Sequence, residues 1–271
     1  MKIVVKIGGS LLDNEETVAG VVRDVVRLAE RNRLIFVHGG GREVNRVAER
    51  LGIKQRWVGK PRPWRVTDKA TMELMRNVIA GGVNAHLCYL VGKFGGKAIG
   101  VNGNESSAIV ARKQEYTEWE EGGETKKEWI GFTGLTKKVN KELFNFLLKN
   151  KFIPVVACIA QGEEDECLNV NGDELAGVLA AQLRCDWLVL LTDVPGFLAD
   201  EGDERSVVKK MSVREIQRLL AEKKVHGGMV AKLEACVDAW KAGARRIVLA
   251  DGRTARPVEN ALKGGGTMVV A

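Results

Sequence analysis

Two glycine-rich segments, each directly after a short apolar run, are the residues of this sequence best suited to chemistry. The first is Lys6-Ile7-Gly8-Gly9-Ser10 and the second is His38-Gly39-Gly40-Gly41. Glycines lack the side chains that would keep an oxyanion away from backbone N–H groups. A helix predicted after each segment would add positive potential at its N-terminus. One such segment is weak evidence, but two in succession predict a site where two anionic groups meet.

Two lysines and one aspartate are the candidate charged groups for such a site. Lys6 lies at the end of the first apolar run, and Lys232 lies about one turn into a helix that opens at 227–229. Asp173 is expected in the first turn of a helix that follows 167–171. Two cations could neutralise a transferring phosphoryl group, and one buried carboxylate could hold both. From the sequence alone, Lys232 could equally be a surface residue with its charge in water. For Lys6 the preceding strand and the following Gly-Gly make that alternative less favoured.

Neither common nucleotide-binding signature is present. The sequence has no GxxxxGK[ST]. The segment 92–97 contains glycines and lysines, but they do not have the spacing that this motif requires. No GxGxxG follows the first apolar run, so a dinucleotide-binding fold is not expected.

Bulk properties exclude several classes of protein. A length of 271 residues suits one large α/β domain or two fused lobes. The net charge of +7 permits nucleic acid, an acidic protein or a phosphorylated ligand, but no nucleic-acid-binding motif is present. The five cysteines are scattered without a CxxC, and there is no signal peptide or membrane-spanning run. We therefore expect a cytoplasmic protein that binds neither nucleic acid nor membrane.

The elements that must position these residues alternate along the chain, which predicts right-handed βαβ units and a parallel sheet. Strands are expected at 2–7, 34–38, 98–101, 152–158, 187–191, 245–250 and 267–270. Helices are expected at 14–31, 42–51, 84–94, 140–149, 173–183 and 212–222, and from 68 and 227 onward. The segment 109–138 is expected to form β-hairpins, with 115–124 as a solvated turn.

The stretch 54–65 is basic and contains no acidic residue. Gly59, Pro61 and Pro63 disfavour a helix, so a loop or hairpin is expected. The stretch is either a solvated basic loop or a surface for an anion or a partner, which its two tryptophans favour. Its charged and aromatic residues are Lys54, Arg56, Trp57, Lys60, Arg62, Trp64 and Arg65.

Together these segments resemble the amino acid kinase family, nearly from end to end. The motifs are VKIGGS (5–10), VHGGG (37–41), RVTD (65–68), LNVNGD (168–173), LTDVPG (191–196), GGMVAK (227–232) and ADGR (250–253). Within the family, the sequence is similar to acetylglutamate kinases. It resembles most closely the branch that phosphorylates 2-aminoadipate or glutamate attached to an acidic amino-group carrier protein.

The resemblance implies an α/β fold, an open αβα sandwich with a mainly parallel central sheet of about eight strands. It implies an N-terminal lobe at 1–172 for the acyl substrate and dimerisation, and a C-terminal lobe at 173–271 for ATP. ATP would be the co-substrate, with Mg²⁺ held mainly by its phosphates and no metal site made by the protein. A homodimer that forms an acyl phosphate in lysine or arginine biosynthesis is expected. No helix precedes the first strand, so no arginine feedback by that route is expected.

The resemblance also implies roles for individual residues. The catalytic residues would be Lys6, Lys232, Asp173, Gly9 and Gly40. The acyl substrate would contact Gly39, Gly40, Arg65 and Asn169. The nucleotide would contact Lys6, Gly8, Gly9, Ser10, Thr192, Asp193, Gly196, Gly228 and Lys232. The surface for the acidic carrier protein would comprise Lys54, Arg56, Lys60 and Arg62.

Several alternatives stay open at this point. The chain could phosphorylate free N-acetyl-L-glutamate, or it could be a nucleotide-binding regulator without turnover. An isopentenyl phosphate kinase is disfavoured, because those relatives carry a histidine soon after the glycines, where this chain has 42–45 as REVN. The sequence also departs from its relatives at 102–105, where they often carry a Ser/Thr-Gly-x-Asp-Gly turn, and at 61–65, where substrate choice is made.

Overall fold

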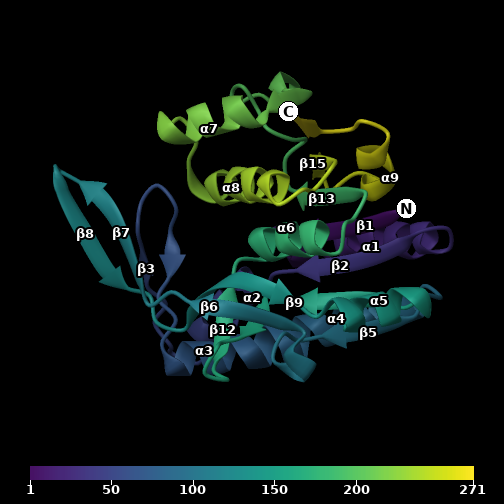
Figure 1. Cartoon of the computed structure of the whole chain (residues 1–271), viewed down its shortest axis with the longest axis horizontal. Coiled ribbons are helices and arrows are strands. Elements are labelled where there is room, and N and C mark those ends of the chain that lie inside the picture. Colours follow the sequence, from purple (N-terminus) through teal and green to yellow (C-terminus); the bar gives the residue numbers. More distant parts are fainter.

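The computed structural model describes residues 1–271 and is built on an eight-stranded central sheet with helices on both faces (Figure 1). The strands lie in the order β14-β16-β15-β13-β1-β2-β10-β5. Neighbouring strands are parallel except β15 and β16, which are antiparallel. Their bounds are β1 Lys2–Ile7, β2 Arg33–His38, β5 Ala98–Val101, β10 Ile153–Ala157, β13 Trp187–Thr192, β14 Lys210–Ser212, β15 Ile247–Asp251 and β16 Thr267–Val270. The predicted mainly parallel sheet of about eight strands is confirmed.

The two faces of the sheet support two separate hydrophobic cores. Helices α1 (Glu15–Ala29), α4 (Asn84–Lys93) and α9 (Pro257–Leu262) pack on one face. The other face carries α2 (Gly41–Arg50), α3 (Lys69–Met75), α5 (Lys141–Lys149), α6 (Gly172–Gln182), α7 (Val213–Ala221) and α8 (Gly227–Lys241). Side chains alternate along a strand, so Ile3, Val5 and Ile7 belong to the first core and Val4 to the second. The same alternation directs Lys6 toward the face that carries α6.

A smaller β structure lies beside the sheet. Strands β6 (Ile109–Lys113), β9 (Thr133–Val139), β11 (Ile159–Gln161) and β12 (Cys167–Val170) close on one another. Two hairpins extend from it: β3 (Trp57–Val58) with β4 (Trp64–Arg65), and β7 (Tyr116–Glu121) with β8 (Glu124–Trp129). The β7–β8 hairpin projects from the body of the molecule (Figure 1). None of the helices is both long and apolar enough to cross a bilayer.

One local expectation was wrong, and one predicted helix has a feature that the sequence did not indicate. The segment 115–124 is mostly strand, because its residues pair with β8, and only Gly122 and Gly123 form the turn. The helix that begins after Asp68 is regular only to Met75 and continues as a π-helical segment, Arg76–Val83, before α4. Segments of this kind frequently occur at functional sites, and this one packs against α2 behind the second glycine segment.

Candidate active site

The candidate active site lies at the carboxyl ends of β1, β2 and β13, where the two glycine-rich segments meet. A cavity of about 540 Å³ opens there between the two halves of the chain. It is lined by Gly8, Gly9, Ser10, Gly41, Arg42, Asn45, Trp57, Arg65, Thr192, Asp193, Val194, Gly228, Met229 and Lys232. Site residues that were predicted in distant parts of the sequence therefore line one cavity.

Lys6, Asp173 and Lys232 form a chain of charges at this cavity, and Lys232 is one of its lining residues. The Nζ of Lys6 lies 2.7 Å from Asp173 Oδ1, and the Nζ of Lys232 lies 3.7 Å from Asp173 Oδ2. Burial lowers the pKa of Lys6, and the charge of Asp173 opposes that effect. Burial alone would raise the pKa of Asp173, but the two lysines hold it below its usual value. The carboxylate is therefore ionised at neutral pH and holds two cations at the cavity floor.

The start of α6 fixes the position of Asp173. Asn171 caps the helix, and its side chain accepts hydrogen bonds from the backbone N–H of Asp173 and Glu174 at 2.9 and 3.2 Å. Lys6 reaches Asp173 because it extends from the α6 side of β1. The capped first turn of α6 and the strand β1 therefore place Asp173 and Lys6 beside each other.

The glycine segments leave backbone groups accessible on one side. The N–H of Gly8 donates to the carbonyl of Leu191 at 3.0 Å, so the first segment is tied to β13. No heavy atom lies within 4 Å of the position that a Cβ would take at Gly9 or at Gly39. A Cβ at Gly40 would lie 3.0 Å from the side chain of Ile79 in the π-helical segment. The open sides of Gly9 and Gly39 are suited to the close approach of an oxyanion.

His38 fixes the backbone of the second glycine segment through hydrogen bonds of its buried side chain. Its side chain is fully buried, and its Nδ1–H donates to the carbonyl of Gly39 at 2.7 Å. Its Nε2 accepts from the side-chain amide of Asn84 at 2.9 Å. Burial lowers the pKa of His38 to about 4, so the ring is neutral at pH 7. The histidine orients the loop and has no free nitrogen for proton transfer.

Arg65 presents a buried guanidinium to the cavity without a carboxylate partner. Nη2 donates to the carbonyl of Gly41 at 3.0 Å, and Nη1 donates to the side chain of Gln55. The guanidinium stacks over Trp57, 4.4 Å from the ring centre, because these two residues are opposite each other in the β3–β4 pair. Burial lowers the pKa of Arg65 to about 10, which still leaves it charged. Its remaining N–H groups can bind a carboxylate.

The other predicted substrate contact, Asn169, is less directly placed. It lies in β12, and its side-chain amide donates to Thr67 Oγ1 at 3.2 Å. It is not among the residues that line the cavity.

A second, mostly apolar cavity adjoins the first one. It has a volume of about 760 Å³ and shares Val194 and Met229 with the site described above. Its apolar lining residues could not be recognised from the sequence, because such residues usually belong to a core. Gly196 forms the bend before it, and the next N–H, that of Phe197, donates to Thr267 Oγ1 at 2.8 Å. The lining residues are Val194, Phe197, Leu198, Ala199, Glu201, Leu219, Lys224, Val225, His226 and Met229.

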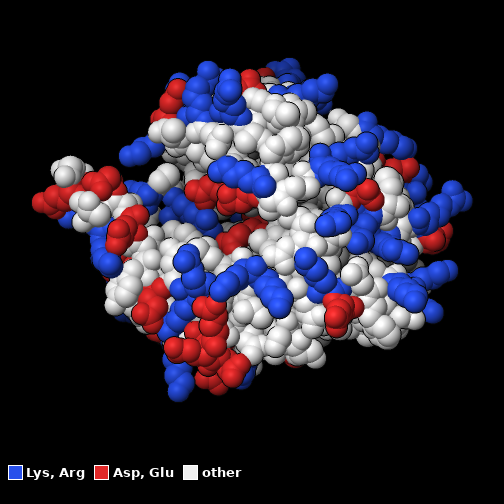
Figure 2. Space-filling view, viewed as in Figure 1, with Lys and Arg blue, Asp and Glu red and all other residues white.

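The basic stretch 54–65 is largely neutralised by the chain itself. Arg56 lies 3.4 Å from Glu128, and Lys60 lies 2.5 Å from Glu121, both on the β7–β8 hairpin. Figure 2 shows acidic side chains gathered on that projecting hairpin, with basic side chains beside it.

Arg62 bridges the two halves of the chain. It lies 2.8 Å from Glu234 of α8 and stacks over Trp64. Of the four residues predicted to bind a carrier protein, only Lys54 has no ion pair.

No group of three or more His, Cys, Asp or Glu side chains is arranged to hold a metal ion. The cationic side chains described at this site are those of Lys6, Arg65 and Lys232. A sequence model of the amino acid kinase family matches residues 1–251. The chain belongs to the amino acid kinase family.

Individual relatives agree with this assignment. The acetylglutamate kinase of Gloeobacter violaceus is 40% identical over 252 residues, which cover 93% of this chain and 80% of that protein. The acetylglutamate kinase of Heliobacterium modesticaldum is 37% identical over 272 residues, which cover 99% of this chain and 91% of that protein. These findings confirm the family, and with it a kinase, as predicted from the motifs.

A solved structure shares the fold of this kinase. It is N-acetylglutamate synthase from Neisseria gonorrhoeae, complexed with coenzyme A and N-acetyl-glutamate, with a TM-score of 0.82. The match covers 100% of this chain and 59% of that one at 20% sequence identity. At this identity the likeness concerns the fold alone.

Proposed function

We propose that this kinase transfers the γ-phosphoryl group of ATP to the side-chain carboxylate of free N-acetyl-L-glutamate, a step of arginine biosynthesis that forms an acyl phosphate. The observation that carries the chemistry is the buried Lys6–Asp173–Lys232 group beside two open glycine segments. The substrate is supported by acetylglutamate kinases at 37–40% identity over at least 93% of this chain.

The acyl substrate would be held at both of its carboxylates. Arg65, already oriented by Trp57 and Gly41, would bind the carboxylate that does not react. The reacting carboxylate has an ordinary pKa of about 4.3, so it is ionised at pH 7 and needs no general base. That fits His38, whose two ring nitrogens are both engaged.

Lys6 and Lys232 would neutralise the negative charge that is shared over the transferring phosphoryl group and the leaving ADP. Asp173 would keep the two ammonium groups in place rather than touch the substrate. The N–H groups of Gly9, Gly39 and Gly40 would complete the contacts to the phosphoryl oxygens and the nucleophile. Catalysis would thus consist of positioning and charge neutralisation.

The nucleotide would lie across the second half of the chain. The apolar cavity beside Phe197 and Met229 is large enough for the base, and it continues into the site that holds Thr192, Asp193 and Lys232. Mg²⁺ fits this chain as an ion bound mainly to the nucleotide phosphates. The one buried carboxylate of the site, Asp173, already holds two lysines, so the protein offers no carboxylate cage.

A carrier-bound substrate is the second candidate, and the ion pairs of 54–65 weaken it. A basic surface that steers an acidic partner needs unpaired charge, whereas Arg56, Lys60 and Arg62 each meet a carboxylate of the same chain. The observation in its favour is Trp57, which is 48% exposed at the mouth of the cavity.

An ADP-release assay separates these candidates. The kinase is supplied with N-acetyl-L-glutamate, or with purified carrier protein that bears glutamate or 2-aminoadipate, at low and high salt. Full turnover on the free acid, unaffected by carrier, is expected. Turnover only with the loaded carrier, lost at high salt, would establish the second candidate instead.

A third alternative, a nucleotide-binding regulator without turnover, is tested by isotope transfer from ATP. Transfer to the acyl substrate that is abolished in Lys6→Ala would exclude it.

We also propose a homodimer in which two copies of the chain meet at the β5 edge of the sheet. Strand β5 ends the sheet with unpaired backbone groups, and Ile99 on it is 39% exposed. Tyr89 of α4, the helix that packs on β5, is 62% exposed. Light scattering of the purified protein and of Ile99→Lys tests this: a dimer that the substitution dissociates is expected, and a monomeric parent contradicts it.

A further inference from the structure

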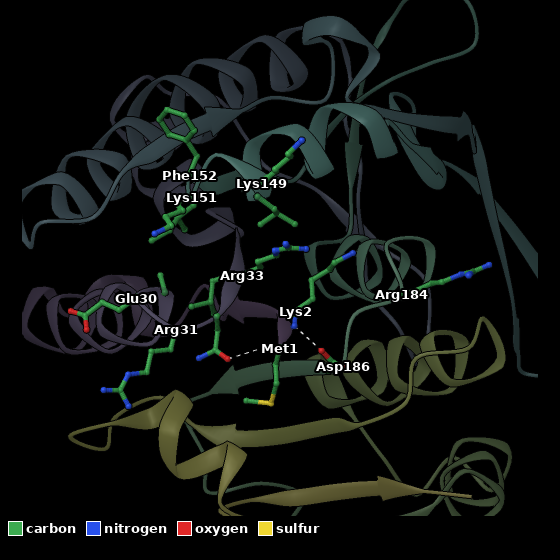
Figure 3. Close-up of a pocket in the computed structure, with 15 residues that line it drawn as sticks. Met1, Lys2, Glu30, Arg31, Arg33, Lys149, Lys151, Phe152, Arg184 and Asp186 are labelled. Carbon is green, nitrogen blue, oxygen red and sulfur yellow. Dashed lines mark hydrogen bonds between the residues drawn. The ribbon is translucent and has the colours of Figure 1, made fainter.

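A pocket rich in basic residues lies at the amino ends of β1, β2, β10 and β13, at the edge of the sheet opposite the candidate active site (Figure 3). Its volume is about 580 Å³. It shares no lining residue with either cavity of the proposed kinase site. Six cations and two carboxylates line it: Lys2, Arg31, Arg33, Lys149, Lys151 and Arg184, with Glu30 and Asp186.

None of the six cations forms an ion pair within the chain. Elsewhere on the surface some exposed arginines are paired, such as Arg27 with Glu259 and Arg253 with Glu204. Within the pocket, the side chain of Lys2 donates only to the carbonyl of Leu183, at 2.6 Å. Asp186 accepts a hydrogen bond from the backbone N–H of Lys2 at 2.7 Å and forms no ion pair with any of the six cations. The pocket therefore has cationic groups without carboxylate partners.

Helix ends explain only part of this charge. Helices α1, α5 and α6 all end at the pocket, and the C-terminus of a helix favours cations because it carries about half a negative charge. Three such ends supply roughly −1.5 and the two carboxylates −2, against +6 from the side chains. An uncompensated positive charge of roughly +2.5 remains.

Two of the cations occupy backbone positions that favour glycine. Lys151 has φ of 60° and Arg184 has φ of 50°, both in the left-handed region just after the ends of α5 and α6. A residue with a Cβ is strained there, and glycine would relieve the strain. The chain instead carries a long cationic side chain at both positions.

The cationic side chains come from several elements around the pocket and point in different directions. Figure 3 shows Arg33 and Lys2 extending from the strand ends, with Lys149 and Lys151 on the α5 side, while Arg31 and Arg184 extend outward at the rim. Cations spread around the pocket match a ligand with separated negative groups better than a single small ion.

We propose that this pocket binds a small polyanion, a molecule with at least two oxyanion groups that are carboxylates or phosphates. Such a ligand would supply the negative charge that the chain does not provide. It would bind without blocking the active site. It would contact the first residues of β1 and β2, whose other ends carry Lys6 and His38.

Calorimetric titration of the full chain, without kinase substrates, tests this proposal. Citrate serves as the polycarboxylate probe and pyrophosphate as the phosphate probe, with acetate as the monoanion. The pocket variant is Arg33→Gln with Lys151→Gly. The matched control, Arg214→Gln with Lys209→Gly, removes the same charges from exposed positions outside the pocket.

Saturable binding of citrate, pyrophosphate or both is expected, with acetate far weaker. The pocket variant should weaken that binding by about tenfold or more, and the control should not. Lys151→Gly alone should raise the melting temperature of the unliganded protein, because glycine removes the backbone strain of a residue in the left-handed region. Weaker binding by this variant could then not be attributed to misfolding.

Absence of saturable binding, or equal weakening in the pocket and control variants, would overturn the proposal. Because substrates are absent, this outcome is independent of whether the kinase phosphorylates N-acetyl-L-glutamate.

Discussion

Lys6 and Asp173 form an ion pair of 2.7 Å, with each side chain only 7% exposed. One residue comes from a central strand and the other from the first turn of a distant helix. A buried charge is costly unless it is paired, so each residue makes the other tolerable. Lys232, at 3.7 Å from the same carboxylate, adds a cation that the pair alone does not neutralise. The group thus retains positive charge for an anionic reactant.

Replacing Asp173 by Asn should remove most of the activity while keeping the shape of the side chain. The two lysines would lose their shared carboxylate, and burial would lower the pKa of Lys6 further, which favours its neutral form. We expect kcat to fall by about 100-fold or more. Steady-state kinetics with saturating substrates gives this value.

Glu174→Gln is the matched control for that substitution. Glu174 is the next residue, and its carboxylate accepts from the N–H of Thr136, a bond that glutamine can also accept. Its kcat should change by less than about threefold. Equal losses in both variants would contradict the role given to Asp173.

Replacing Arg65 by Lys should weaken binding of the acyl substrate alone. Lysine keeps the charge but loses the planar group that stacks on Trp57 and donates to Gly41. We expect the KM for N-acetyl-L-glutamate to rise by about tenfold or more, with the KM for ATP unchanged. Arg56→Lys, an exposed pair with Glu128, is the control and should change neither constant. A parallel rise in both constants for Arg65→Lys would indicate a general structural defect instead.

The parts of the site that could be predicted from the sequence are local. The glycines after β1 and β2 and the position of Asp173 near a helix start follow from neighbouring residues, and the structure has them there. The convergence of Lys6 and Lys232 could not be derived in this way. Their distance depends on which strands pair and which helix covers them, and only the family resemblance supplied that information.

The stretch 54–65 shows where local patterns were misleading. Its composition indicated a free basic surface, yet its partners Glu121, Glu128 and Glu234 lie far along the sequence. The stacking of Arg65 on Trp57 likewise depends on the register of β3 with β4. Local composition shows which charges are present, but only the fold shows which of them are neutralised.

The Arg62–Glu234 pair should couple the substrate hairpin to the helix that carries Lys232. The two side chains are 18% and 35% exposed, so solvent screening leaves a modest energy of about 1 kcal/mol. A double-mutant cycle with Arg62→Gln and Glu234→Gln should therefore show coupling of about 1 kcal/mol in the free energy of unfolding. Additive effects of the two substitutions would show that the contact contributes nothing.

His38 should make the stability of the protein depend on pH in mildly acidic solution. Its pKa is about 4 in the folded chain, against 6.5 ordinarily, so the unfolded state takes up the proton first as pH falls. The free energy of unfolding is therefore fully present above pH 6.5 and declines as pH falls toward 4. Between pH 6.5 and 5 the loss should be about 1.5 kcal/mol. Urea unfolding at several pH values measures it.

His38→Gln is the variant that isolates this effect. The free energy of unfolding of the variant should be lower than that of the parent at pH 7, because the hydrogen bonds to Gly39 and Asn84 are perturbed. Because glutamine does not titrate, the free energy of unfolding of the variant should change less between pH 6.5 and 5. The two proteins are compared by how steeply the free energy of unfolding changes with pH, so a lower absolute stability of the variant does not affect the comparison. If parent and variant lose stability in parallel over this range, the titrating group is not His38.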